Sequence, residues 1–252
     1  AGRAVPACQS ALQSYPNVRR FATALGYALQ KRGQQQEAAR EYRRAAEAED
    51  PTALTLLAAA YREGLGVPQD LGQAFELYTR AAGLGSPAAT HAIGWLYENG
   101  LGRPVDPVKA AEWYTRGAQL GFAESWTQLG WLAQNGLGQK VDFDRAYDSY
   151  ERGARLGSTL AMHQLGFMNQ NGLGRTADLA RAYEWYSRAA QAGRAESMTL
   201  IGQFNLEGLG RPVDVDRAVE WFERAAGAGS SAAMHQPRVL NLEGVGRRGD
   251  PA

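Results

Sequence analysis

The sequence is poor in cysteine and lysine and has no long apolar run. Cys8 is the single cysteine among 252 residues, so no intrachain disulfide can form and the redox compartment stays open. No stretch of about 18 apolar residues occurs, which argues against a transmembrane segment. The first ten residues, AGRAVPACQS, lack the apolar core of a signal peptide. These absences exclude a disulfide-stapled fold, but they do not assign a compartment.

A dominant charge is also missing. The 27 basic and 26 acidic residues give a formal net charge of +1, and the only lysines are Lys31, Lys109 and Lys140. Because nucleic-acid binders gather basic residues on one face, this balance predicts no nucleic-acid partner. Hydrophobic residues make up 44% of the chain and charged residues 21%, which is typical of a folded protein rather than a disordered one.

What the sequence does contain is an internal repeat. A glycine-rich segment returns every 36 residues, as EGLGVPQD (63–70), NGLGRPVD (99–106), NGLGQKVD (135–142), NGLGRTAD (171–178), EGLGRPVD (207–214) and EGVGRRGD (243–250). Each copy holds two glycines two positions apart and ends in aspartate. A fixed period of this size is the signature of a repeat array.

Two helical patterns fill each period. In the second copy, PAATHAIGWLYEN (87–99) and PVKAAEWYTRGAQLG (107–121) place apolar residues at helical spacing. Gly94 lies inside the first pattern, where glycine costs about 1 kcal/mol relative to alanine. Its equivalents are all small: Ala58, Gly130, Gly166 and Gly202. We therefore expect close approach of the paired helix, with its aromatic row filling the space between helices: Tyr78, Tyr114, Tyr150, Tyr186 and Phe222.

The glycine-rich segment itself is predicted to connect the two helices. Gly100 follows a helix, where a residue with positive φ is most favourable as glycine. Asp106 precedes the next helix, where a carboxylate can cap free N–H groups. A phosphate-binding loop would need a preceding strand and a Gly-Lys-Ser/Thr ending, and a calcium loop would need carboxylates at alternate positions. Neither pattern is present.

The spacing changes at the two ends. Residues 21–51 fit a 34-residue tetratricopeptide repeat with a shorter connector, and residues 4–15 fit the second helix of a preceding repeat. We divide the chain into a lead-in (1–50), five 36-residue repeats (51–230), and a partial sixth repeat with a tail (231–252). Pro237 is expected to delay or distort the helix it lies in. Neither end shows a polar capping repeat, which favours a segment of a longer protein or end-to-end self-association.

The repeated residues carry a resemblance. The pattern A-x-x-x-[LI]-G, then G-x-G-x-x-x-D, then A-x-x-W/Y-Y-x-R-A-A-x-x-G resembles the Sel1-like repeat, a relative of the tetratricopeptide repeat, over residues 51–230. The resemblance implies an all-α fold, a right-handed α-solenoid of antiparallel helix pairs with the first helices on the concave face. It also implies a scaffold or adaptor for protein complexes. The opening residues resemble the lead-in of bacterial proteins in which a caspase-like peptidase domain precedes such repeats.

Catalytic and metal chemistry are disfavoured by the same periodicity. His91, His163 and His235 occupy one position in alternate repeats, with Thr55, Thr127 and Thr199 between them. Packed helices lie 8–10 Å apart as a rule, so histidines two repeats apart form a ladder and cannot share a metal. We predict no metal, no cofactor and no enzyme activity. The carboxylates and arginines four apart on the second helices, such as Glu184 and Arg188, are expected to form exposed ion pairs.

The remaining candidate site is a stripe on the first helices. Aromatic, imidazole and amide side chains recur there at helical spacing, a combination that suits a peptide because rings supply buried area and amides satisfy its backbone. The alternative is that the aromatic residues only cover neighbouring helices. The predicted partner-binding residues are Thr55, His91, Trp95, Glu98, Asn99, Thr127, Trp131, Gln134, Asn135, His163, Phe167, Gln170, Thr199 and Gln203.

Three functional hypotheses follow from these features. The preferred one is a non-enzymatic scaffold that binds a peptide or protein segment in the groove. The alternatives are a regulatory or sensor segment of a larger bacterial enzyme, such as a caspase-like peptidase, and a binder of glycan or peptidoglycan fragments. The bacterial cytoplasm and the periplasm both stay open as compartments.

Overall fold

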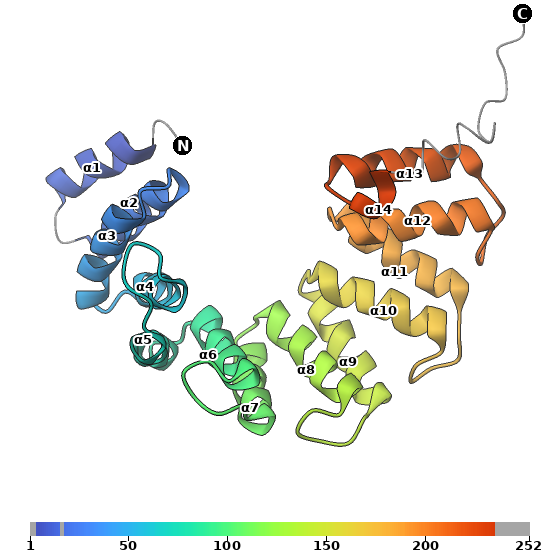
Figure 1. Cartoon of the computed structure of the whole chain (residues 1–252), viewed down its shortest axis with the longest axis horizontal. Helices are drawn as coiled ribbons and strands as arrows, with labels where there is room; N and C mark the ends of the chain where they lie inside the picture. Colours follow the sequence, from blue (N-terminus) through green and yellow to red (C-terminus); the bar gives the residue numbers. More distant parts are fainter. Residues whose placement is uncertain (1–3, 16–17, 235–252) are drawn as a thin grey trace, which may run out of the picture. The chain divides into compact units, whose positions relative to one another are not determined.

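The structure, a computed structural model, describes residues 4–15 and 18–234. Every regular element in these ranges is a helix (Figure 1). The helices are α1 (Ala4–Ser14), α2 (Arg19–Lys31), α3 (Gln35–Glu47), α4 (Pro51–Glu63), α5 (Leu71–Gly83), α6 (Pro87–Asn99), α7 (Pro107–Gln119), α8 (Ala123–Asn135), α9 (Phe143–Arg155), α10 (Thr159–Asn171), α11 (Leu179–Gln191), α12 (Ala195–Glu207), α13 (Val215–Gly227) and α14 (Ser231–Met234).

The helices fall into two compact units, Ala1–Phe122 and Ala123–Ala252. In the first unit α2 pairs with α3, α4 with α5 and α6 with α7, and in the second α8 pairs with α9, α10 with α11 and α12 with α13. Successive pairs within a unit also pack on each other, as α5 does on α6 and α11 on α12. The predicted all-α solenoid of antiparallel helix pairs is confirmed. The division into 1–50, 51–230 and 231–252 stays a prediction.

The connectors have the predicted chemistry at both of their ends. Gly100 ends α6 with a φ of 66°, and its N–H bonds the carbonyl of Leu96. Asp106 begins α7 by accepting a hydrogen bond from the backbone N–H of Lys109 at 2.9 Å. The same aspartate cap recurs at α5, α9, α11 and α13. Stop and start signals of this kind are local, so each repeat can fold its own connector.

The second glycine of each connector has a role that the sequence did not reveal. A Cβ built on Gly102 would lie 2.8 Å from the Cβ of Leu71, the first residue of α5 in the preceding repeat. A Cβ on Gly174 would lie 2.7 Å from the carbonyl oxygen of Phe143, the first residue of α9. Both glycines also have positive φ, 71° and 69°. The connector of one repeat therefore rests directly on the backbone or first side chain of the previous second helix.

Close contact within each helix pair explains the glycine inside the first helix. A Cβ on Gly94 would lie 2.8 Å from the ring of Tyr114, and one on Gly166 would lie 2.5 Å from the ring of Tyr186. The aromatic row on the second helices is fully buried, as predicted: Tyr78, Tyr114, Tyr150, Tyr186 and Phe222. The lead-in repeats the arrangement, because a Cβ on Gly26 would lie 2.6 Å from the ring of Tyr42. The predicted helix-to-helix contact is confirmed.

Cys8 on α1 is partly buried and packs against the core of the first unit. Pro237 lies outside the described residues. Over the part of the chain that the structure describes, the helices are too short or too polar to span a bilayer.

The prediction of ion pairs between carboxylates and arginines four apart on the second helices, such as Glu184 and Arg188, is wrong, because the arginines stack on tryptophan rings instead. Glu184 and Arg188 form no ion pair in the described part of the chain, and the guanidinium of Arg188 lies over the ring of Trp185 at 4.6 Å. The same stacking joins Arg116 to Trp113 at 4.7 Å and Arg224 to Trp221 at 5.0 Å. A guanidinium is weakly hydrated and flat, so an adjacent indole face competes well with an exposed carboxylate.

Candidate functional site

In the second unit, the first helices expose two aromatic rings at the same repeat position. Trp131 on α8 is 37% exposed and Phe167 on α10 is 39% exposed. Gln203 on α12 occupies the equivalent position and is partly buried. Because the two rings occupy equivalent positions on successive first helices, they lie on the same side of their repeats. We refer to Trp131, Phe167 and their flanking amides as the aromatic patch.

In the first unit, the ring at the equivalent repeat position is more covered. Trp95 on α6 is half-buried and packs against the core of that unit, with the guanidinium of Arg62 lying 4.9 Å from its ring centroid. Of the two interpretations of the stripe, coverage of a neighbouring helix therefore fits Trp95. Exposure to a partner fits Trp131 and Phe167.

Asparagines beside the rings are exposed and held in place. The side-chain Nδ2 of Asn135 donates to the carbonyl of Trp131 at 2.8 Å, and that of Asn171 donates to the carbonyl of Phe167 at 2.8 Å. Asn99 makes the same bond to Trp95 at 2.9 Å. An amide fixed in this way still offers its Oδ1 acceptor and a second N–H, which matches the donors and acceptors of a peptide backbone.

The neighbouring glutamate and glutamines are turned toward the helix pair. Gln134 accepts a hydrogen bond from the hydroxyl of Tyr150 at 3.1 Å, and Gln170 accepts one from Tyr186 at 2.9 Å. Burial raises the pKa of both tyrosines, so their hydroxyls stay protonated and donate. Glu98 accepts the equivalent bond from Tyr114, while burial raises the pKa of its carboxyl. These hydrogen bonds join the two helices of a repeat.

The threonines of the stripe connect successive repeats. Thr127 Oγ1 lies 2.9 Å from Ser158 Oγ, and Thr199 Oγ1 lies 2.9 Å from Ser230 Oγ. Thr127 is 3% exposed and Thr199 is 7% exposed. In the first unit Thr55 makes the same contact with Ser86 at 3.0 Å. Thr127 and Thr199 therefore join successive repeats from buried positions, and their predicted role in partner binding stays a prediction.

The histidines take the corresponding place in alternate repeats. Nδ1 of His163 lies 2.9 Å from Ser197 Oγ, and its ring centroid lies 5.4 Å from that of Tyr186. The ring of His91 lies 5.0 Å from the rings of both Tyr114 and Phe122. Burial lowers the pKa of each histidine to about 4. Both imidazoles are therefore neutral near pH 7 and act mainly as packing and hydrogen-bonding groups.

The chemistry available on this face is recognition by contact. In the described ranges, no three histidine, cysteine or carboxylate side chains gather as a metal site would require. The aromatic patch offers the rings of Trp131 and Phe167 and the fixed amides of Asn135 and Asn171. The partly buried Gln203 occupies the equivalent position on α12. The sequence pointed to these residue types, whose role in partner binding stays a prediction, but it could not separate the exposed rings from the covered one.

Comparison with known proteins supports the repeat assignment. A family model described as Sel1 repeat matches residues 51–86, 87–122, 127–158, 159–193 and 195–230. The crystal structure of a Sel1 repeat protein from Oxalobacter formigenes superposes with a TM-score of 0.79 at 29% identity, covering 87% of this chain and 89% of the other. No curated protein sequence matches the chain.

A second structure extends the comparison to a longer protein. The protective antigen c5321 of uropathogenic Escherichia coli, which displays an SLR fold, superposes with a TM-score of 0.79 at 26% identity. The match covers 98% of this chain but 53% of the antigen, so the chain spans about half of its length. A Sel1 repeat protein of Klebsiella pneumoniae, 22% identical over 76% of this chain and 95% of its own, shares the fold with a TM-score of 0.53.

Proposed function

Because the chain belongs to the Sel1 repeat family, whose members generally serve as protein-interaction scaffolds, we propose that it is a non-enzymatic adaptor that captures an extended peptide segment on the first-helix face of its second unit. The observation that carries the proposal is the paired exposure of Trp131 and Phe167 on adjacent first helices. Rings of this kind dominate the energetics of protein interfaces because they bury a large apolar area with few rotatable bonds.

The flanking amides support a peptide rather than a flat protein surface as ligand. Asn135 and Asn171 are each anchored to their own helix one turn from the ring, so they present backbone-like polar groups in fixed positions. An extended peptide needs partners for its own N–H and C=O groups as well as contacts for its side chains. The rings and amides together meet both needs.

A displayed library of short random peptides tests the proposal. Peptides selected on the wild-type chain should bind the Trp131→Ala/Phe167→Ala variant at least about tenfold more weakly, since loss of an interface aromatic costs 2 kcal/mol or more at a hot spot. The matched control is Leu156→Ala, because Leu156 is an exposed apolar residue of the same unit at the end of α9.

Two results would count against the proposal. Selected peptides that bind the double variant as tightly as the wild type would place recognition elsewhere. Retention of glycan fragments but not peptides on the wild-type chain, lost in the double variant, would assign the aromatic patch to carbohydrate stacking. Circular dichroism of both variants should show unchanged helicity, because the replaced rings are more than a third exposed.

A further inference from the structure

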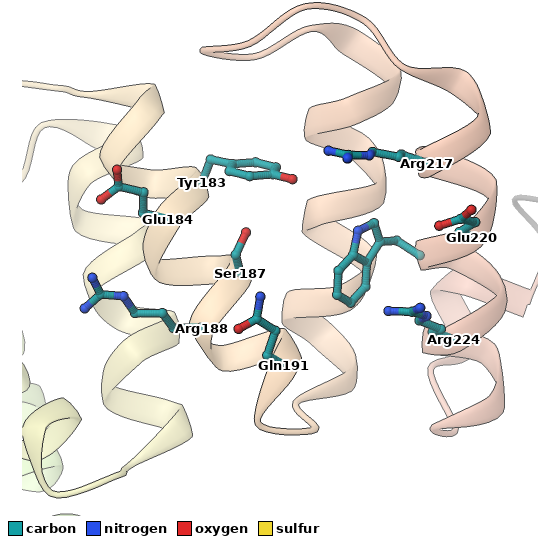
Figure 2. A pocket seen from close by; sticks show the side chains of 9 residues that line it. Tyr183, Glu184, Ser187, Arg188, Gln191, Arg217, Glu220 and Arg224 are labelled. Atoms are coloured by element: carbon teal, nitrogen blue, oxygen red, sulfur yellow. The ribbon is translucent and has the colours of Figure 1, made fainter.

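A cavity of about 490 Å³ opens on the second helices of the second unit, between α11 and α13. Figure 2 shows Tyr183, Ser187 and Gln191 extending from α11 toward α13, and Arg217 and Arg224 extending from α13 toward α11. Trp221, which lies between Arg217 and Arg224 in the sequence, also lines the cavity. This volume lies within the range of sites that hold small ligands or peptide side chains.

The two walls differ in charge. The α11 wall presents the phenol of Tyr183, the hydroxyl of Ser187 and the amide of Gln191, and it also carries one acidic and one basic residue, Glu184 and Arg188 (Figure 2). The α13 wall presents two guanidinium groups and an indole ring, with Glu220 at its margin. Arg217 is partly neutralised by Asp214, whose Oδ2 lies 3.5 Å from its Nε.

Arg224 extends from α13 toward α11 and carries a guanidinium that a ligand in the cavity can reach (Figure 2). Its guanidinium lies 5.0 Å from the ring centroid of Trp221 and forms no ion pair or hydrogen bond with the described residues. Stacking on an indole holds the planar fork in one orientation and leaves its N–H edge open. An oriented, unpaired guanidinium is the group that proteins use to bind a carboxylate through two parallel hydrogen bonds.

The preceding repeat differs at this position. One period earlier, Ser187 and Gln191 correspond to Glu151 and Arg155, which form an ion pair at 3.3 Å on α9. A hydroxyl at the Ser187 position also occurs in α5 and α7, as Thr79 and Thr115. The cavity between α11 and α13 therefore has a hydroxyl where α9 has a carboxylate, and its acidic lining residues are Glu184 and Glu220.

We propose that this cavity is a second binding site, separate from the aromatic patch, which takes a carboxylate side chain of an acidic peptide. The carboxylate pairs with Arg224, the neighbouring apolar residue of the peptide rests against the face of Trp221, and Ser187 and Gln191 bond its backbone. The site lies on the second helices, whereas the aromatic patch lies on the first helices, so one array can hold two segments of a partner.

Fluorescence anisotropy with two labelled peptides tests this site. The probe is Gly-Glu-Phe-Glu-Gly with an N-terminal fluorescein, and the comparison is the same peptide with both glutamates replaced by glutamine. Wild-type protein should bind the acidic peptide at least about tenfold more tightly, as expected for a charge-assisted bidentate pair. Equal binding of the two peptides, or no binding of the acidic one, would overturn the proposal.

Matched variants locate the binding. Arg224→Gln and Ser187→Glu should each weaken acidic-peptide binding about tenfold, the first by removing the donor and the second by adding a carboxylate that repels the peptide. Arg152→Gln and Thr79→Glu make the same charge changes at equivalent positions of other repeats and should change binding less than about twofold. Equal losses in the control variants would reduce the effect to net charge and refute the site.

Two further arms separate this site from its rivals. Trp131→Ala/Phe167→Ala should leave acidic-peptide binding unchanged, so failure of one proposal does not decide the other. Inorganic phosphate should displace the peptide no better than acetate at equal ionic strength. Preferential displacement by phosphate would overturn the assignment to a carboxylate.

Discussion

Replacing Gly174 with alanine should destabilise the second unit strongly, although the residue lies in a connector. Its φ of 69° is in the left-handed region, and a Cβ would lie 2.7 Å from the carbonyl oxygen and 2.8 Å from the carbonyl carbon of Phe143. Both of these atoms belong to the backbone at the start of α9, so a rotamer change cannot relieve the collision.

The size of the effect follows from two contributions. Left-handed backbone costs an alanine about 1 kcal/mol relative to glycine. Forcing an extra carbon into a filled space costs about 1–3 kcal/mol. We therefore expect Gly174→Ala to lower the free energy of unfolding by about 3 kcal/mol, a large fraction of the 5–15 kcal/mol that is typical of folded domains.

Gly193→Ala is the matched control for the backbone contribution. Gly193 also has a positive φ, 95°, but a Cβ there would meet nothing within 4 Å. We expect a loss of about 1 kcal/mol for this variant. Urea denaturation followed by circular dichroism would measure both, and with a slope of about 2 kcal/mol per molar the midpoint of Gly174→Ala should fall by about 1.5 M.

The difference in stability between Gly174→Ala and Gly193→Ala tests whether the connector rests on α9. If Gly174→Ala proves no less stable than Gly193→Ala, the connector does not rest on α9 as described, and the second glycine of the repeat serves only its turn. A change in the slope as well as the midpoint would indicate that the repeats no longer unfold together, which a quasi-one-dimensional array permits.

Three smaller predictions concern single side chains of the second unit. Asp178→Ala should cost about 1 kcal/mol in urea denaturation because the helix loses its cap, while Asp178→Asn should keep most of that stability; equal losses would argue against capping. Tyr186→Phe should cost about 1 kcal/mol by removing the hydrogen bond to Gln170, and an unchanged midpoint would show that the bond adds nothing. Burial lowers the pKa of His163 to about 4, below the 6.5 of an unperturbed ring, so its contribution to stability is present above pH 6.5 and lost as the pH falls toward 4. His163→Gln should therefore flatten the fall of the melting temperature over this range, and an unchanged pH profile would contradict the buried neutral ring.

Local signals in the sequence were enough for the elements and their boundaries. Gly100 and Asp106 act through bonds to residues within a few positions, so their roles as helix end and helix cap could be predicted without a structure. The same holds for Gly94, since an unfavourable glycine inside a helix requires a packing reason and the next helix is the nearest candidate. These predictions are confirmed because their physical causes lie inside one repeat.

Features that depend on two repeats were out of reach. Position 102 is a glycine because a Cβ there would collide with Leu71 of the preceding repeat. Thr127 is buried where it contacts Ser158 of the following repeat. Nor could periodicity show that Trp131 is more exposed than Trp95, because that difference depends on whether a neighbouring side chain such as Arg62 covers the ring.

The side-chain hydrogen bonds between successive repeats alternate between two kinds, so a repeat of one kind fits only between repeats of the other. Thr127 meets Ser158 at a helix cap, whereas His163 reaches Ser197, which lies inside the first turn of the next first helix. Loss of residues 158–193, one repeat, would bring Arg194 instead of a serine to the cap position facing Thr127. Loss or duplication of two repeats would again bring a serine to the cap position facing Thr127. Recombination within the gene should therefore be tolerated in even steps, and designed versions of the array should be lengthened two repeats at a time.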